Sequence, residues 1–331
     1  MITMPADYQQ PSAAPLLHTT TVTVGLDVGG TKTKALLVDE NRRLLAQTQC
    51  ATDATSPAGV TGSIVTAVNT ALAQAGIAPS QIEAIGIGVP GLVRPQDGVV
   101  QLAANLNLRE YALAEAVTAV FQAPVTLEND VRLAAVGAYQ HLRARQPIQH
   151  MAYLSVGTGI AAGVTLNGRL WRGARGMAGE IGHIVVEPEG ARCACGQRGC
   201  LETVASGPAI TGMAARLMRP SAQNNLTAGD VYRAAQSGDP TAQTIVQRVS
   251  YYLGRAIQWL IMSYDVEKVV LGGGVAQAGP AFLDPILSEL AQMRANSRLA
   301  ETMLGAAKIT LLPPGYNAGV WGAIALAQKG D

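Results

Sequence analysis

The sequence predicts an α/β protein built from two similar units, each a β-sheet with helices on both faces. Two runs rich in β-branched residues, starting near residues 21 and 151, each pass through a glycine turn into two further strands. Each run is followed by segments with helical apolar spacing that alternate with short buried strands. A plan that occurs twice in 331 residues predicts two lobes with a cleft between them.

The first unit is expected over residues 21–129, as the smaller lobe. Its start, TVTVGLDVGGTKTKALLVDENRRLLAQTQ, predicts strand, glycine turn, strand, polar turn and strand. Residues 58–76 carry helical apolar spacing, and QIEAIGIGVPG is typical of a buried strand that ends in a turn. Residues 1–20 lack the basic start and apolar core of a signal peptide, so we expect a disordered tail.

The second unit is expected over residues 130–316, beginning with a helix over 130–145. From residue 151, MAYLSVGTGIAAGVTLNGRLWRG repeats the three-strand plan, with an Asn-Gly hairpin turn. A terminal helix over 317–328 should pack back on the first unit together with the rest of residues 317–331. The remaining expected elements are helices over 207–219, 227–237, 241–264 and 281–297, and strands within EKVVLGGGVA and KITLLPPG.

Composition excludes several classes of protein. The formal net charge of +1 argues against nucleic acid or a membrane surface as the main partner, because both usually require a basic patch. No apolar run approaches the roughly 20 residues that span a bilayer. Four cysteines, three of them in a metal-binding pattern, indicate a reducing compartment, so we expect a cytoplasmic protein.

Residues 176–206 contain a candidate zinc site. His183 is followed ten residues later by a C-x-C-x4-C pattern formed by Cys193, Cys195 and Cys200. Three thiolates and one imidazole complete a closed tetrahedral zinc site, which leaves no position for a water nucleophile. We therefore expect a structural Zn²⁺ that holds a loop over residues 183–202, rather than three unrelated core cysteines.

Three glycine turns are candidate phosphate-binding and nucleotide-binding segments. They are DVGGTKTK at 27–34, VGTG at 156–159 and LGGGVA at 271–276. Backbone N–H groups in such turns approach an anion without a side chain in the way. Each turn alone is equally compatible with a tight hairpin, and none is a G-x-x-x-x-G-K-[ST] loop, so the chain is not a P-loop protein.

Taken together, these motifs closely resemble the ROK family of sugar kinases and related proteins, within the actin-like ATPases. DVGGTKTK resembles the first phosphate motif, LSVGTGIAAGV the second and LGGGVA the adenosine motif; G-x-x-G-E-I-G-H with C-x-C-G-x-x-G-C-L-E resembles the family's zinc signature. Ala161 and Ala162 stand where many members carry glycine. The resemblance implies an actin-like (ribonuclease H-like) fold with duplicated βββαβαβα units. It also implies ATP and Mg²⁺ as cofactors, and phosphoryl transfer to a sugar hydroxyl, usually the 6-hydroxyl of a hexose. The residues it assigns to nucleotide binding are Asp27, Gly29, Gly30, Thr31, Lys32, Gly157, Thr158, Gly159, Gly272, Gly273 and Gly274.

Asp130, in TLENDVRLAAVGAY, is the candidate general base. Phosphoryl transfer to an alcohol needs a carboxylate within hydrogen-bond reach of the attacking hydroxyl. The residues alone leave an alternative, because Asn129 or Asp130 would also be a good helix N-cap. The family's catalytic aspartate lies in the same Glu-Asn-Asp context, and this resemblance favours the base. Glu128 is interpreted as part of the strand end.

Glu180, His183 and Glu202 are candidate sugar ligands, because carboxylates accept hydrogen bonds from vicinal hydroxyls; a salt-bridged surface is the alternative for either glutamate. The resemblance implies that His183 binds zinc through one nitrogen and the sugar through the other. Asn129 offers a donor and an acceptor to a hydroxyl. Asn105 and Gly91 match positions that approach the sugar in similar kinases, although Asn105 would equally suit an Asx-turn.

Asp27 is expected to orient Mg²⁺ through water, and Lys34 is interpreted as an exposed hairpin lysine.

An ATP-dependent kinase of D-glucose is the favoured function. N-acetylmannosamine, N-acetylglucosamine, fructose or allose are alternative substrates, and polyphosphate an alternative donor. A sugar-responsive regulator is disfavoured, since only about 20 residues precede the first phosphate motif and a DNA-binding domain needs several helices. Similar kinases suggest a homodimer or homotetramer.

Overall fold

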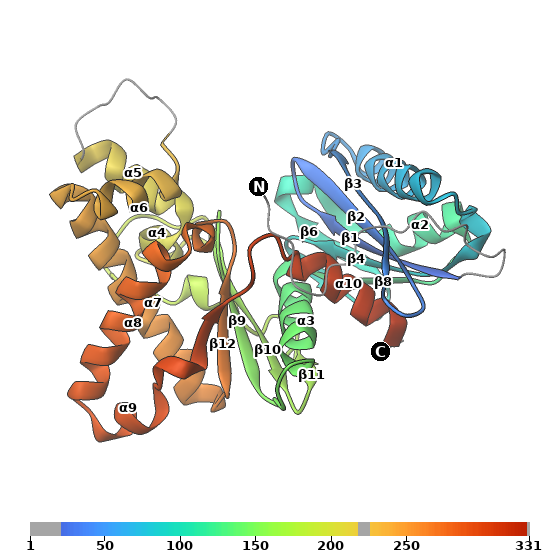
Figure 1. Ribbon diagram of the computed structural model, residues 1–331. Helices are drawn as coiled ribbons and strands as arrows, with labels where there is room; N and C mark the ends of the chain where they lie inside the picture. Colours follow the sequence, from blue (N-terminus) through green and yellow to red (C-terminus); the bar gives the residue numbers. More distant parts are fainter. Residues whose placement is uncertain (1–20, 218–225, 330–331) are drawn as a thin grey trace. The chain divides into compact units, whose positions relative to one another are not determined.

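The computed structural model describes residues 21–217 and 226–329, and these divide into two compact units (Figure 1). The first unit comprises the chain up to Pro147, the segment Arg172–Met177 and the chain from Pro314; the second comprises Ile148–Trp171 and Ala178–Pro313. The tail expected over residues 1–20 lies outside the described residues. No helix of the described part is long and apolar enough to cross a membrane.

The first unit is built on a five-stranded sheet whose order is β3-β2-β1-β4-β8. β1, β2 and β3 are antiparallel neighbours, whereas β4 pairs in parallel with both β1 and β8. The three consecutive strands follow from the short turns between them, which only antiparallel pairs allow. The strands are β1 (Val22–Val28), β2 (Lys32–Asp39), β3 (Leu44–Ala51), β4 (Ile82–Val89) and β8 (Val125–Asn129).

Helices cover both faces of this sheet. Leu37 of β2 belongs to the core that α1 (Pro57–Ala75) closes, whereas Leu36 packs with Val320 of α10 (Ala318–Lys329). Adjacent strand residues point to opposite faces, so α1 and α10 lie on opposite sides. α2 (Leu113–Phe121) joins the core on the α1 side.

The first unit extends beyond the expected boundary at residue 129 because α3 (Asp130–Arg143) packs against α10. Gly137 allows the close approach, since a Cβ there would lie 2.0 Å from the carbonyl oxygen of Ala318. Tyr316 donates a hydrogen bond to the Gly137 carbonyl at 3.1 Å. This unit also contains a three-stranded sheet that was not expected. Its strands are three to five residues long, which is too short to show a clear alternation in the sequence. They are β5 (Leu92–Arg94), β6 (Val99–Ala103) and β7 (Leu108–Tyr111).

The second unit repeats the topology. Its sheet has the order β11-β10-β9-β12-β13, in which three antiparallel strands are again followed by two parallel ones. The predicted duplication is therefore confirmed at the level of strand order. The strands are β9 (Met151–Val156), β10 (Ile160–Leu166), β11 (Arg169–Trp171), β12 (Lys268–Gly272) and β13 (Ile309–Leu311).

One continuous hydrophobic core joins this sheet to the helices of the second unit. The glycines after β12 lead into a 3-10 turn, Val275–Ala278, and then into α8, as the LGGGVA motif predicted. The expected helix over 207–219 is described as far as Leu217. The helices are α4 (Glu202–Ala205), α5 (Gly207–Leu217), α6 (Ala228–Gln236), α7 (Pro240–Tyr264), α8 (Pro280–Ala295) and α9 (Arg298–Met303).

Candidate active site

Asp130 is the first residue of α3, and Asn129 is its N-cap. The side-chain oxygen of Asn129 accepts from the backbone N–H groups of Val131 at 3.0 Å and Arg132 at 3.1 Å. The amide also donates to the carbonyl oxygen of Gly91 at 3.1 Å. Of the two capping candidates, Asn129 therefore does the capping, and the Asp130 carboxylate is not required for it.

The pKa of the Asp130 carboxyl group is shifted toward neutral pH. Burial, and after it the negative charge of Asp27, raises the pKa of Asp130 from 3.8 to about 6. The backbone N–H of Val131, which donates to Asp130 Oδ1 at 2.8 Å, opposes this shift, as does the charge of Arg132. A carboxylate with such a pKa is ionised at pH 7 yet binds a proton readily, as a general base requires.

Asp27 lies near the end of β1, where burial raises its pKa. The charge of Lys34 and a hydrogen bond with the side chain of Asn317 lower that pKa in part. Lys34 is half-buried and stands opposite Asp27 in the β1–β2 register, so it is not the exposed hairpin lysine that was expected. Counting residues back from the β1–β2 turn would have predicted that Lys34 lies opposite Asp27. Nothing in the sequence near Asp27 identifies Asn317 as its hydrogen-bond partner.

The first phosphate motif forms the β1–β2 turn. The N–H of Gly29 donates to the carbonyl oxygen of Lys32 at 2.9 Å, and the side chains of Thr31 and Lys32 are exposed. A Cβ on Gly30 would lie 2.7 Å from the carbonyl oxygen of Asn105. Only glycine lets this turn approach Asn105 so closely.

Asn105 and Gly91, both expected near the sugar, lie in the first unit. Asn105 is exposed in the 3-10 turn Ala104–Leu106. Gly91 has a φ of +91°, and a Cβ on it would lie 2.2 Å from the carbonyl oxygen of Leu102, so no other residue fits without displacement.

Glu128, directly before Asn129, has no exposed surface and forms two ion pairs. Its carboxylate oxygens lie 2.9 Å from Arg132 Nε and 2.6 Å from Arg172 Nε. Arg132 also donates to the carbonyl oxygen of Gly176. These contacts tie the segment Arg172–Met177 to the end of β8, which agrees with the interpretation of Glu128 as a structural residue.

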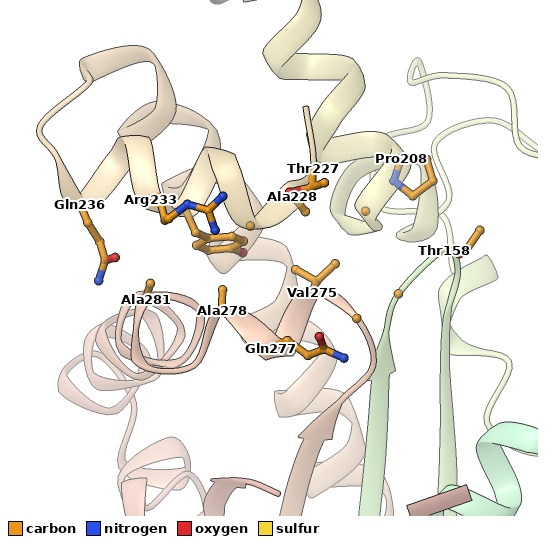
Figure 2. A pocket seen from close by; sticks show the side chains of 15 residues that line it. Thr158, Pro208, Thr227, Ala228, Arg233, Gln236, Val275, Gln277, Ala278 and Ala281 are labelled. Atoms are coloured by element: carbon orange, nitrogen blue, oxygen red, sulfur yellow. The ribbon is translucent and has the colours of Figure 1, made fainter. Parts of the chain in front are cut away.

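The second unit contains a cavity of about 710 Å³, within the usual range for a small-molecule site. Gly157 and Thr158 of the second glycine turn line it together with Gly274 of the third (Figure 2). Two motifs more than 100 residues apart in the sequence thus meet at one cavity. Further lining side chains, which the sequence did not single out, are Thr227, Arg233, Gln236 and Gln277.

The glycines of the third turn differ in how much space surrounds them. Gly273 has a φ of +85°, and a Cβ on it would lie 2.4 Å from the carbonyl oxygen of Val156. A Cβ on Gly272 would lie 2.0 Å from the Tyr153 hydroxyl, whereas one on Gly274 would meet no atom within 4 Å. Gly272 and Gly273 therefore let β12 pack on β9, and Gly274 faces the cavity.

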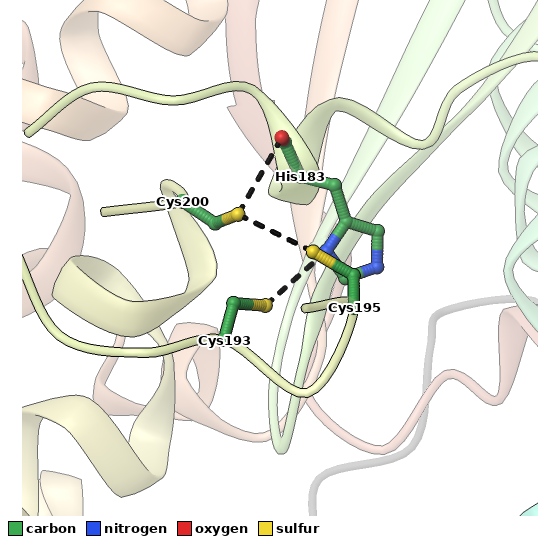
Figure 3. A group of neighbouring side chains, drawn as sticks. All are labelled: His183, Cys193, Cys195 and Cys200. Atoms are coloured by element: carbon green, nitrogen blue, oxygen red, sulfur yellow. Dashed lines mark hydrogen bonds between the residues drawn. The ribbon is translucent and has the colours of Figure 1, made fainter. Parts of the chain in front are cut away.

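The four predicted zinc ligands form one cluster in the second unit (Figure 3). One ligand atom from each of them lies within 4.8 Å of the others. Cys193 Sγ is 3.5 Å from His183 Nδ1, and Cys195 Sγ is 3.6 Å from Cys200 Sγ. Tetrahedral zinc, with Zn–S of about 2.3 Å and Zn–N of about 2.0 Å, puts ligand atoms about 3.5–3.8 Å apart. The donor set and these two distances are compatible with zinc, which Nδ1 of His183 would coordinate.

The other two predicted sugar ligands of the second unit, Glu180 and Glu202, lie close in sequence to this cluster. Glu180 is exposed and precedes the 3-10 turn Ile181–His183. Glu202 begins α4 two residues after Cys200, and its Oε2 accepts from the backbone N–H of Ile160 at 2.9 Å. This bond of Glu202 was not expected from the sequence.

Comparison with known proteins decides the family. The family model described as ROK family matches residues 23–330. The chain belongs to the ROK family. This ROK chain is 35% identical over 275 residues to a glucokinase of Halalkalibacterium halodurans, covering 80% of the chain and 83% of that relative. It is 34% identical over 258 residues to an N-acetylmannosamine kinase of Yersinia pseudotuberculosis, covering 77% of the chain and 83% of that relative.

The fold of this ROK chain is that of solved ROK kinases. A ROK family glucokinase from Streptomyces griseus, solved in complex with glucose and AMPPNP, superposes with a TM-score of 0.74 at 31% identity. The match covers 93% of this chain and 99% of that one. The predicted actin-like ATPase fold and the predicted membership of the ROK family are both confirmed.

Proposed function

We propose that this ROK chain is an ATP-dependent hexose kinase that phosphorylates the 6-hydroxyl of D-glucose. The observation that carries the proposal is the place of Asp130 as the first residue of α3, directly after the Asn129 cap; burial and Asp27 also raise the pKa of its carboxyl group to about 6. Similarity to the H. halodurans glucokinase, and to the S. griseus enzyme solved with glucose and AMPPNP, supports the sugar and the nucleotide.

Asp130 acts as the general base. Its carboxylate accepts the proton of the 6-hydroxyl as the bond from that oxygen to the γ-phosphorus forms. The bond between the γ-phosphorus and the β,γ-bridging oxygen breaks, and ADP leaves with the electron pair. Asn129, by capping α3, and Glu128, by holding Arg132, keep Asp130 at a fixed point of the helix start. Such preorganisation lowers the entropy cost of reaching the transition state.

The cavity of the second unit receives the nucleotide. Its wall at Gly157, Thr158 and Gly274 carries no bulky side chain, so phosphates and ribose can approach the backbone there. The turn Gly29–Lys32 of the first unit, with two glycines, is a second candidate for phosphate binding. Magnesium, when bound, screens the charge of the phosphates, and Asp27 would orient it through water.

We propose Glu180, His183 and Glu202 as sugar ligands, together with Asn129, Asn105 and Gly91. Zinc, when bound, supplies a structural crosslink that His183, Cys193, Cys195 and Cys200 would hold. With Nδ1 directed at the thiols, Nε2 of His183 carries the N–H that a sugar hydroxyl can accept.

A kinase of N-acetylmannosamine is the second candidate, because the similarity to such an enzyme at 34% identity nearly equals that to the glucokinase. A coupled assay of ADP release distinguishes the two with glucose, mannose, fructose, allose, N-acetylglucosamine and N-acetylmannosamine as acceptors. We expect the highest kcat/KM with glucose. Turnover of an N-acetyl sugar with none of glucose would overturn the substrate assignment, and Asp130→Asn serves as the control for contaminating kinases.

The donor, assembly and location complete the proposal. We propose ATP rather than polyphosphate as donor, a homodimer or homotetramer, and a cytoplasmic location, where the three thiols of the cluster stay reduced. Replacing ATP with polyphosphate in the same assay, detected as glucose 6-phosphate, tests the donor. Light scattering coupled to size exclusion measures the assembly.

A further inference from the structure

The first residues of β10 have an edge that no strand of the described chain pairs with. β11 pairs with β10 only at Val164–Leu166, which leaves the outer edge of residues 160–162 without a strand neighbour. The segment 179–202, which contains the predicted zinc loop, supplies the missing acceptors. Glu202 Oε2 accepts from the N–H of Ile160 at 2.9 Å, and the carbonyl oxygen of Gly179 accepts from the N–H of Ala162 at 2.7 Å.

Glycines bring the loop and the strand into direct contact. A Cβ on Gly159 would lie 2.5 Å from Glu202 Oε2, and a Cβ on Gly182 would lie 2.0 Å from the carbonyl oxygen of Ile160. The carboxylate of Glu202 thus packs directly on the turn Gly157–Gly159. The same turn has a second tie, because the carbonyl oxygen of Gly157 accepts from the N–H of Gly207 at 2.8 Å.

We propose that Glu202 is a positioning residue for the phosphate-binding turn Gly157–Gly159 as well as a ligand of the sugar. One carboxylate oxygen holds the N–H of Ile160, so the other is the one that a sugar hydroxyl would engage. The inference rests on the proposed function, because it gives a role in nucleotide binding to a residue assigned there to the sugar. A carboxylate is a strong acceptor for a backbone N–H, so its loss should loosen the turn and weaken phosphate binding.

Nucleotide affinity without sugar separates the two roles of Glu202. Binding of Mg-AMPPNP would be measured by calorimetry for the wild type, Glu202→Ala, Glu202→Gln and the matched control Glu180→Ala. We expect Glu202→Ala to bind about tenfold more weakly, which corresponds to losing one charge-assisted hydrogen bond. Glu202→Gln keeps an acceptor for Ile160 and should recover most of the affinity. Glu180→Ala should match the wild type, because Glu180 has no described contact with the turn.

Amide hydrogen exchange provides a second readout, which requires neither the nucleotide nor the sugar. Peptides spanning residues 157–162 should exchange faster in Glu202→Ala than in the wild type or Glu180→Ala. Zinc content and melting temperature show whether each variant is folded. If Glu202→Ala does not fold, Glu202→Asp tests the same bond, because its carboxylate is one methylene too short to reach Ile160.

Unchanged AMPPNP affinity and unchanged exchange in Glu202→Ala would overturn the proposal and leave Glu202 with the sugar alone. Failure of the proposed function gives a different result. A wild-type protein that binds AMPPNP but phosphorylates no hexose would refute the kinase assignment, while the comparison of the variants would still stand. If the wild type bound no AMPPNP, the exchange rates alone would decide.

Discussion

Replacing Asp130 with asparagine should make the protein more stable at neutral pH while removing its activity. The carboxyl group has a pKa of about 6 in the folded chain, against 3.8 outside it. Below pH 3.8 both states hold the proton, and as the pH rises toward 6 the unfolded state loses it first. Above pH 6 the ionised carboxylate therefore costs the folded state about 3 kcal/mol at most. Because Asp130 is only partly buried, we expect about 1–2 kcal/mol.

Asparagine keeps the oxygen that accepts from the N–H of Val131 but never ionises. Urea unfolding of Asp130→Asn should show a gain of about 1–2 kcal/mol at pH 7 that shrinks toward zero near pH 4. In the kinase assay, loss of the general base should lower kcat by about 10²–10⁴. The wild type should show an acidic limb in kcat/KM, falling about tenfold from pH 7 to pH 5, because the ionised fraction of a group with a pKa near 6 falls by that factor.

Two results would refute this reasoning. If Asp130→Asn keeps more than a tenth of the wild-type kcat, Asp130 is not the base. If the variant is no more stable than the wild type at pH 7, the carboxylate is not held at a cost in the folded state, and the origin of the raised pKa is wrong.

Three further changes test the surrounding structure. Cys200→Ser should reduce bound zinc, measured by plasma mass spectrometry, below one ion per chain and lower the melting temperature; full zinc content would contradict the proposed ligand set. Gly273→Ala should cost more than about 2 kcal/mol, since its Cβ would clash with the carbonyl of Val156, whereas Gly274→Ala should melt like the wild type; equal melting of both would contradict this packing. Glu128→Gln, which leaves two arginines without their buried partner, should cost about 3–5 kcal/mol in urea unfolding, and a loss under 1 kcal/mol would show that the pairs are dispensable.

Much of the fold and part of the site could be predicted from the sequence because their signals are local. Strand alternation, the glycine turns and the helical apolar spacing of residues 58–76 depend on residues a few positions apart. The cluster of His183, Cys193, Cys195 and Cys200 was predictable for the same reason, since its four residues lie within about twenty positions of one another. β5, β6 and β7 escaped prediction because strands this short have too few residues to show a period.

The partners of the site residues depend on chain segments that only folding brings together. Lys34 meets Asp27 because of the β1–β2 register, and Asn317 reaches Asp27 from the far end of the chain. Glu202 meets Ile160 because the loop after β11 returns to the uncovered edge of β10. The sequence by itself determined which motifs this protein carries, whereas the tertiary structure decided which residues tune them, because a buried charge or an unpaired N–H takes its partner from whatever the fold places beside it.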